Sequence, residues 1–172
     1  NPLCSPTRAS IMTGKNPDRI GCHMDPVDAR MPERAEPWKK VLIPQPKTYL
    51  PQTEYTLANA MQDSGYNTVF LGKWHLGQKP FMPENHGFED NIGGMSWGGP
   101  KSYFSPYQNP NLPDGAEGEH LTDRLVDEAA NWIENHKNNP KPFFMCLWNY
   151  AVHSPYQAKE EYIKKYENKE DP

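Results

Sequence analysis

The sequence predicts an α/β fold with a parallel sheet, and the order of its elements is the main reason. Amphipathic helical segments alternate with short apolar segments in the order helix, strand, loop, helix, strand, loop. The second apolar segment, residues 143–148, has no charged residue, which is typical of a strand buried on both faces of a parallel sheet. A chain of 172 residues is long enough for one domain of ordinary size.

The first predicted element is a short helix over residues 5–14. Ser5 suits its N-cap, Pro6 its first helical position, and Gly14 its end. Residues 15–52 are rich in proline and charge, and we expect them to form a long irregular connection.

A helix and a strand follow this connection. Residues 54–64 have helical spacing of apolar positions, with Thr53 as the cap and Gly65 at the end. Residues 67–71 then form a short strand. The loop at the carboxyl end of that strand covers residues 72–77.

The second half of the chain repeats this order. A long loop region, with a short strand near residues 88–92, precedes a second helix, whose apolar positions recur with helical spacing. The loop region covers residues 78–119, and the second helix covers residues 122–136. The second main strand covers residues 143–148, and a final charged helix covers residues 158–168.

Two loops are expected to matter most for function. Ligands of parallel α/β sheets bind beyond the carboxyl ends of the strands, which here are residues 72–77 and 151–157. The first loop contains Lys73 and His75, and the second contains His153.

Composition excludes several classes of protein. The formal net charge of −4 argues against a general nucleic-acid-binding protein, which usually has a basic surface. No apolar run approaches the roughly 20 residues of a membrane-spanning helix. The three cysteines, Cys4, Cys22 and Cys146, are odd in number and widely spaced, so they suggest neither a disulfide framework nor a zinc site.

Cys4 lies where a helix N-terminus is predicted. A thiol there experiences the positive end of the helix dipole, and the same position attracts anions such as sulfate or phosphate. Arg8, four residues on, could reach back toward Cys4. Taken alone, this pattern fits equally a small cysteine packed at the mouth of a helix with a surface arginine nearby.

Two longer motifs extend the pattern. The segments PLCSPTR at residues 2–8 and IMTG at residues 11–14 resemble the first signature of the type I sulfatases. The segments GYNT at residues 65–68 and GKWHLG at residues 72–77 resemble the second signature, in the family's order and at a familiar separation. The resemblance continues through residues 83–88 and 143–155. The chain is therefore identified as an arylsulfatase-like member of this formylglycine-dependent family, within the alkaline phosphatase superfamily.

The resemblance implies a larger fold than this chain can form. It implies part of an alkaline-phosphatase-like sandwich, with a mostly parallel sheet flanked by helices. Residues 1–172 would be a partial N-terminal catalytic domain that lacks the first strand and the C-terminal part. Because the first motif begins at once and without a methionine, we expect the chain to be an internal piece of a longer protein.

The resemblance also implies sulfuric ester hydrolysis. Cys4 matches the residue that is converted to formylglycine, whose hydrate attacks sulfur with one hydroxyl and expels sulfate when the other loses its proton. Arg8 matches the residue that holds the diol, and Lys73 the one that bridges the diol and a sulfate oxygen. His75 matches the base of the expulsion step, and His153 a sulfate contact that protonates the leaving alcohol.

Two of these assignments have open alternatives. His153 stands in AVHSP where many relatives have APHxP, and it could be a structural loop histidine. Ser96, in the glycine-rich segment at residues 93–99, could contact sulfate or could be an ordinary loop residue.

The implied cofactor is Ca²⁺, with Cys4, as formylglycine, the only ligand in this chain. The family's other metal-ligating carboxylates are expected upstream and downstream of it, and a hard cation needs several oxygen ligands. We therefore expect this chain alone to be inactive. The implied partners are a sulfate ester, such as a sulfated carbohydrate or an aryl sulfate, and a formylglycine-generating or anaerobic maturation enzyme; no nucleic acid or membrane span is implied. The implied location is periplasmic or secreted.

Two rival functions stay open at this point. A phosphonate or phosphodiester hydrolase of the same superfamily would use the same cradle, because sulfate and phosphate esters are both tetrahedral oxyanions. A non-catalytic relative could hold sulfated glycans without hydrolysing them.

Overall fold

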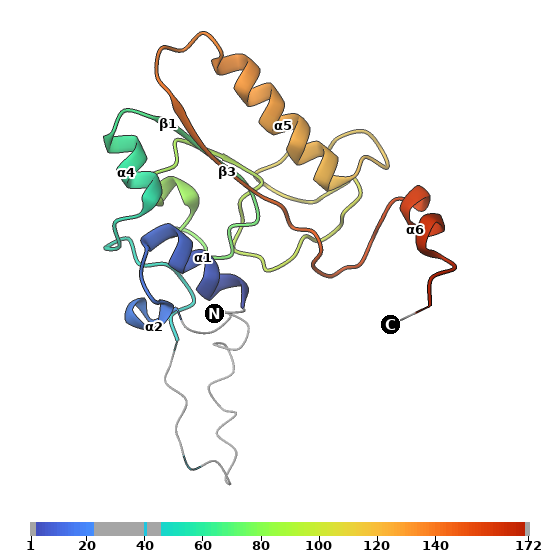
Figure 1. The fold of residues 1–172 in the computed structure, drawn as a ribbon, viewed down its shortest axis with the longest axis horizontal. Helices are drawn as coiled ribbons and strands as arrows, with labels where there is room; N and C mark the ends of the chain where they lie inside the picture. The colour runs from blue at the N-terminus through green and yellow to red at the C-terminus, as the bar shows by residue number, and fades with distance from the viewer. Residues whose placement is uncertain (1–2, 23–39, 41–45, 171–172) are drawn as a thin grey trace.

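The fold is a three-stranded parallel sheet with helices on both faces, seen in a computed structural model that describes residues 3–22, 40 and 46–170 (Figure 1). The strand order is β2-β1-β3, and β1 pairs in parallel with both neighbours. The predicted α/β class is therefore confirmed. The elements are α1 (Cys4–Thr13), α2 (Pro17–Ile20), α4 (Leu57–Asp63), β1 (Asn67–Gly72), η1 (Pro83–His86), β2 (Asp90–Ile92), α5 (Leu121–His136), β3 (Phe143–Trp148) and α6 (Glu160–Tyr166).

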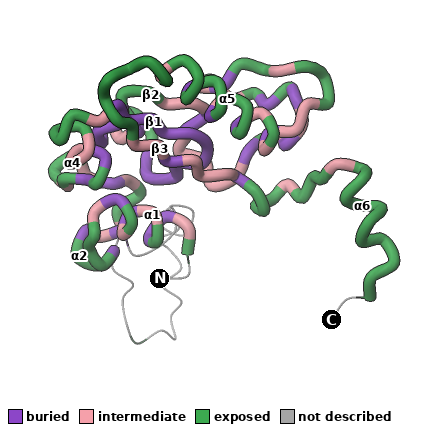
Figure 2. Tube along the Cα trace, turned by 45° about the horizontal axis from the view of Figure 1, so that its top comes forward, coloured by how far each residue is buried: buried purple, intermediate pink, exposed green. Residues whose placement is uncertain are grey.

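The central strand β1 organises the core. All six of its residues are buried, as Figure 2 shows along the middle of the sheet. Val69 and Leu71 pack against Ala129 and Trp132 of α5 on one face. Phe70, between them, faces the other side of the sheet because side chains alternate along a strand.

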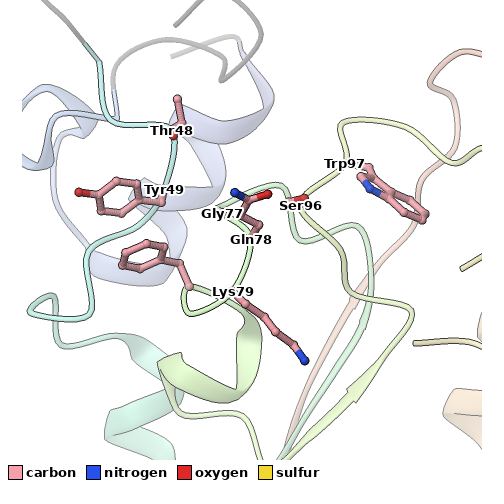
Figure 3. Close-up of a pocket in the computed structure, with 8 residues that line it drawn as sticks. Thr48, Tyr49, Gly77, Gln78, Lys79, Ser96 and Trp97 are labelled. Carbon is pink, nitrogen blue, oxygen red and sulfur yellow. The ribbon is translucent and has the colours of Figure 1, made fainter. Parts of the chain in front are cut away.

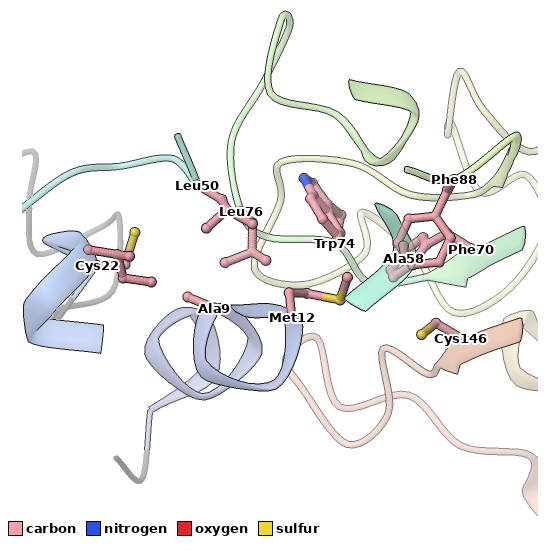
Figure 4. Packing of buried hydrophobic residues seen from close by; sticks show 11 residues of the cluster. Ala9, Met12, Cys22, Leu50, Ala58, Phe70, Trp74, Leu76, Phe88 and Cys146 are labelled. Atoms are coloured by element: carbon pink, nitrogen blue, oxygen red, sulfur yellow. The ribbon is translucent and has the colours of Figure 1, made fainter. Parts of the chain in front are cut away.

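The second face of the sheet is covered by α1 and α4. Ala9 and Met12 of α1 belong to one buried cluster with Trp74 and Leu76, which follow β1 (Figure 4). Ala58 of α4 joins the same cluster. The helix that carries Cys4 is therefore held directly over the chain that leaves the carboxyl end of β1.

Strand β3 has the predicted bounds but not the predicted burial. Cys146 is its only buried residue, and Phe143 is 44% exposed. Within the described residues β3 pairs with β1 alone, so one of its edges lies open. The expectation that this strand is buried on both faces is therefore wrong for this chain.

Two helix starts differ from the prediction. Helix α1 begins at Cys4 with Leu3 as its N-cap, because the Ser5 hydroxyl donates a hydrogen bond to the His75 carbonyl at 2.9 Å instead of capping the helix. The predicted end at Gly14 is confirmed, with φ at 67°. Helix α4 is capped by Thr56, and not by Thr53 as predicted, through a reciprocal capping box with Asn59.

The other boundaries shift by a few residues. The short strand predicted near residues 88–92 is β2, and the final helix is limited to Glu160–Tyr166. Residues 15–52 contain the four-residue helix α2, while residues 23–39 and 41–45 of that predicted connection lie outside the described residues. No helix among the described ranges is long and apolar enough to cross a membrane.

His86 is a buried histidine at the end of η1. Its side chain is 0% exposed and lies 5.5 Å from the Trp74 ring between centroids. Neither ring nitrogen has a hydrogen-bond partner among the described residues, and burial lowers the pKa of His86 to about 4. The folded state therefore favours the neutral imidazole.

This burial predicts a stability that depends on pH. The unfolded chain binds a proton at His86 near pH 6.5, whereas the folded chain binds it only near pH 4. The contribution is therefore fully present above pH 6.5 and is lost as pH falls toward 4, by about 3 kcal/mol in total.

Urea unfolding of the wild-type protein and of His86→Gln between pH 7 and pH 4 measures this effect. We expect His86→Gln to flatten the loss of stability over this range. An equal slope in both proteins would contradict the assignment.

Candidate active site

The candidate site forms where β1 and β3 end and α1 begins. The Lys73 backbone N–H donates to the Trp148 carbonyl at 2.7 Å, which keeps the two strand ends together. Gly72 allows this approach, since a Cβ built on it would lie 2.1 Å from the Trp148 carbonyl oxygen. The two predicted site loops therefore leave the sheet side by side.

Two side chains of helix α1 donate hydrogen bonds to the backbone of the first site loop. Arg8 donates from Nη1 to the Lys73 carbonyl at 2.5 Å, and Ser5 donates to the His75 carbonyl. These bonds join the Cys4 helix to the backbone of Lys73 and His75, so the two sequence motifs meet in space.

Cys4 opens onto a cavity of about 470 Å³. The cavity is lined by Leu3, Cys4, Thr7, Arg8, Ile11, Trp148, Asn149 and Ala151. The Arg8 guanidinium lies over the Trp148 ring, 4.8 Å from its centroid. Burial lowers the pKa of Arg8, and its interactions with Cys4 and Tyr150 oppose that shift. The cavity thus joins a cysteine at a helix N-terminus to a largely buried arginine.

Lys73 and His75 are both buried where they follow β1. Lys73 is 3% exposed and His75 is 2% exposed. His75 has φ at 58°, in the left-handed region that costs a non-glycine residue of order 1 kcal/mol or more. Its N–H donates to the Met95 carbonyl at 3.0 Å, and its carbonyl accepts the Ser5 hydrogen bond. These two bonds hold the strained backbone of His75 in place.

His153 lies in the exposed loop after β3. Its backbone N–H is shared between the Tyr103 hydroxyl and the Tyr150 carbonyl, each at 3.1 Å. The Tyr103 N–H in turn donates to the Gln157 side chain at 2.8 Å. Tyr103, which is 3% exposed, therefore anchors the loop that presents His153.

Two consecutive glycines lie against the rings of the two site histidines. A Cβ built on Gly98 would lie 3.0 Å from Cε1 of His75, and one built on Gly99 would lie 2.7 Å from Nδ1 of His153. Both imidazoles therefore pack against consecutive residues of one loop.

Of the predicted site residues, Cys4 and Arg8 line the Cys4 cavity; Lys73, His75 and His153 are not among its lining residues, and neither is Ser96. Ser96 lines a second cavity together with Gln78 and Trp97. Its contact with sulfate stays a prediction.

The described residues do not fit a calcium site on their own. No group of three or more His, Cys, Asp or Glu side chains among them is placed to hold a metal ion. In the cavity next to Cys4, the buried Asn149 Oδ1 has no hydrogen-bond partner among the described residues, so one oxygen donor is available there. A single donor does not make a site for a hard cation.

Comparison with known proteins decides the family. The profile of the family described as Sulfatase matches residues 1–172, the whole of this sequence. The chain belongs to the sulfatase family. The predicted resemblance is confirmed.

The sulfatase relatives are longer than this chain. The N-acetylgalactosamine-6-sulfatase of Mus musculus is 30% identical over 187 residues, which cover 95% of this chain and 33% of the relative. The chain thus spans about a third of the length of the curated relatives it matches.

Solved structures agree with the fold. Ps i-CgsB in complex with k-i-k-neocarrahexaose has a TM-score of 0.74 at 26% identity, covering 99% of this chain and 39% of that protein. BT4656 in complex with its substrate D-glucosamine-2-N,6-O-disulfate has a TM-score of 0.69 at 25% identity, covering 100% of this chain and 29% of that protein.

Several residues at this sulfatase site were missed by the sequence analysis. Asn149 directly follows β3, and the rule that ligands bind beyond strand ends could have identified it. Tyr103 contacts His153, which lies 50 residues away in the sequence. Gly98 and Gly99 contact His75 and His153, which belong to other loops. No local sequence pattern signals these contacts.

Proposed function

We propose that the longer protein containing this chain hydrolyses sulfate esters, with Cys4 oxidised to formylglycine as its nucleophile. The observation that supports this most directly is the joining of the two motifs: Arg8 and Ser5 of the Cys4 helix bond to the carbonyls of Lys73 and His75. A hydrated formylglycine would supply two hydroxyls on one carbon, one to attack sulfur and one whose deprotonation releases sulfate.

Each charged or titratable residue then has one role. Arg8, at the mouth of the Cys4 cavity, binds and orients the modified residue. Lys73, buried at the end of β1, stabilises negative charge on the sulfuryl oxygens. His75 accepts a proton during sulfate release, and His153 donates one to the leaving alcohol. The overall reaction consumes one water and yields an alcohol, sulfate and a proton.

Calcium is the metal implied by the family, and its remaining ligands would come from parts of the protein outside this chain. The described residues do not fit the ion on their own. We propose for the same reason that residues 1–172 alone do not turn over sulfate esters. A separate formylglycine-generating or anaerobic maturation enzyme would oxidise Cys4, and the protein would act in the periplasm or outside the cell.

A sulfated carbohydrate is the proposed substrate. The names of two relatives support this choice: one is a sulfatase of N-acetylgalactosamine, and the other binds a glucosamine disulfate as its substrate.

One comparison of rates tests the function. We expect the purified full-length protein to hydrolyse para-nitrophenyl sulfate faster than the matching aryl phosphate diester. A faster rate on the diester would favour the phosphodiesterase of the same superfamily. Peptide mass spectrometry of Cys4 adds a second reading, because an unmodified thiol in active protein would overturn the formylglycine proposal. An intact aldehyde without any turnover would favour a glycan-binding relative.

Gly98→Ala is expected to lower kcat about tenfold with little change in KM, because the new methyl group would displace the His75 ring by a few tenths of an ångström. Gly98 is a positioning residue in this account. The measurement is a kcat and KM pair with a pH profile, checked by thermal unfolding to confirm that the fold is intact. An unchanged kcat with an unchanged pH profile would contradict the role given to His75.

A further inference from the structure

A second cavity, of about 620 Å³, lies beside the proposed site (Figure 3). It is lined by Thr48, Tyr49, Gly77, Gln78, Lys79, Phe81, Ser96 and Trp97. Thr48 and Tyr49 also line a small cleft that contains Ser5 and His75. The cavity therefore adjoins the side of the proposed site on which His75 lies, and its size is that of a typical small-molecule site.

The walls of this cavity are fixed by contacts within the fold. The Tyr49 and Phe81 rings stack with centroids 4.0 Å apart and an interplanar angle of 14°. The Trp74 indole donates to the Phe81 carbonyl at 2.8 Å, and the Leu50 N–H donates to the Leu76 carbonyl at 2.8 Å. A cavity with such walls is preformed, so little ordering cost opposes ligand binding.

The lining combines neutral hydrogen-bonding groups with positive charge. Thr48, Gln78 and Ser96 offer hydroxyl and amide groups, and Figure 3 shows the Gln78 amide directed toward Ser96. Lys79 supplies an exposed cation, and no acidic side chain is among the described residues that line the cavity.

An aromatic ring completes this lining. Trp97 is half-buried, and the Lys101 ammonium lies 4.9 Å from its ring centroid. Lys101 lies over one face of the ring and is not among the residues that line the cavity. The remaining ring surface is apolar, so the CH face of a sugar can stack on it, while Lys79 attracts negative charge from the lining itself. A neutral aryl group would use the ring but not the Lys79 cation, so the lining favours an anionic sugar.

We propose that this cavity binds a second, anionic sugar ring of the substrate glycan, adjacent to the sugar whose sulfate is hydrolysed. The proposal rests on the proposed function and deepens it, because it makes the protein a sulfatase of oligosaccharides in which a sulfate or carboxylate lies on the neighbouring ring. Trp97 supplies the stacking surface, Lys79 the countercharge and Gln78 hydrogen bonds to sugar hydroxyls.

The test compares the full-length protein with its Trp97→Ala and Lys79→Gln variants. Calorimetry measures binding of a chondroitin sulfate tetrasaccharide, in which carboxylate-bearing rings alternate with sulfated ones, and of its sulfated monosaccharide. We expect the wild type to bind the tetrasaccharide more tightly, and each variant to lose about tenfold of that affinity, the effect of one stacking or charge contact. Trp97→Phe, which keeps an aromatic ring, should recover most of the loss. Lys141→Gln is a matched control, because Lys141 is exposed before β3 and away from the cavity.

The outcomes separate this proposal from the proposed function. The second-ring site is overturned if the wild type binds the tetrasaccharide and the monosaccharide with equal affinity. It is also overturned if the wild type and both variants bind the tetrasaccharide with equal affinity. Absence of para-nitrophenyl sulfate turnover by the wild type overturns the sulfatase function, while the binding data still decide the role of the cavity.

Discussion

Replacing Cys4 by alanine in the full-length protein should abolish sulfate ester hydrolysis, with a loss of about 10⁴-fold or more in kcat. Cys4 opens helix α1 and lines the cavity that Arg8 and Trp148 complete. Without this residue no aldehyde can form, and the covalent route is closed. Rates on para-nitrophenyl sulfate, measured with equal amounts of folded protein, report the effect.

The other two cysteines provide matched controls. Cys22 and Cys146 are buried free thiols, and burial raises the pKa of each to about 11, so both stay protonated and unreactive at neutral pH. Cys22→Ala should therefore keep the activity, apart from a loss of stability. Turnover by Cys4→Ala within tenfold of the wild type would eliminate the formylglycine mechanism. So would turnover by residues 1–172 alone that survives this substitution.

Lys73→Ala should reduce kcat by about 10²- to 10³-fold, the usual effect of removing one preorganised group that stabilises transition-state charge. The ammonium is buried at the end of β1, where water competes little for it. The carbonyl of the same residue accepts the Arg8 hydrogen bond, and that backbone contact survives the substitution. The loss should therefore be confined to the chemistry and should leave the position of α1 unchanged.

Kinetics and unfolding together check the Lys73 prediction. Lys141→Ala removes an exposed lysine before β3 and should leave kcat within a factor of two. Equal activity of Lys73→Ala and the wild type would show that this cation does not face the sulfuryl group. A thermal midpoint lowered in proportion to kcat would instead indicate a structural role.

Local patterns were enough to predict the strands and the site loops. Residues 143–148 have the predicted strand bounds because an uncharged apolar run leaves few alternatives, and parallel pairing then places the loops after β1 and β3 side by side. The helix caps were less predictable. Ser5 is a residue type that favours the N-cap position and stands just before a helical segment. Its hydroxyl nevertheless donates to the carbonyl of His75, 70 residues away, and no local rule predicts this hydrogen bond.

The contacts that support the site residues could likewise not be predicted from the sequence. Gly98 and Gly99 looked like ordinary loop glycines, and only the folded chain shows that they pack against His75 and His153. No local pattern indicates that His86 is fully buried. The burial of β3 was overestimated because an apolar run does not reveal how many neighbours a strand has within a given stretch of chain.

The docking of α1 limits when the proposed oxidation of Cys4 could occur. The motif at residues 2–8 includes Pro6 and Arg8, and in the folded chain Pro6 is buried while Arg8 is engaged with the Lys73 carbonyl. An enzyme that reads this motif as an extended peptide would have to bind before α1 closes over the sheet. Nascent chains that fold before modification would keep an ordinary thiol at Cys4. The fraction of modified protein should therefore depend on the rate of folding relative to the rate of Cys4 oxidation.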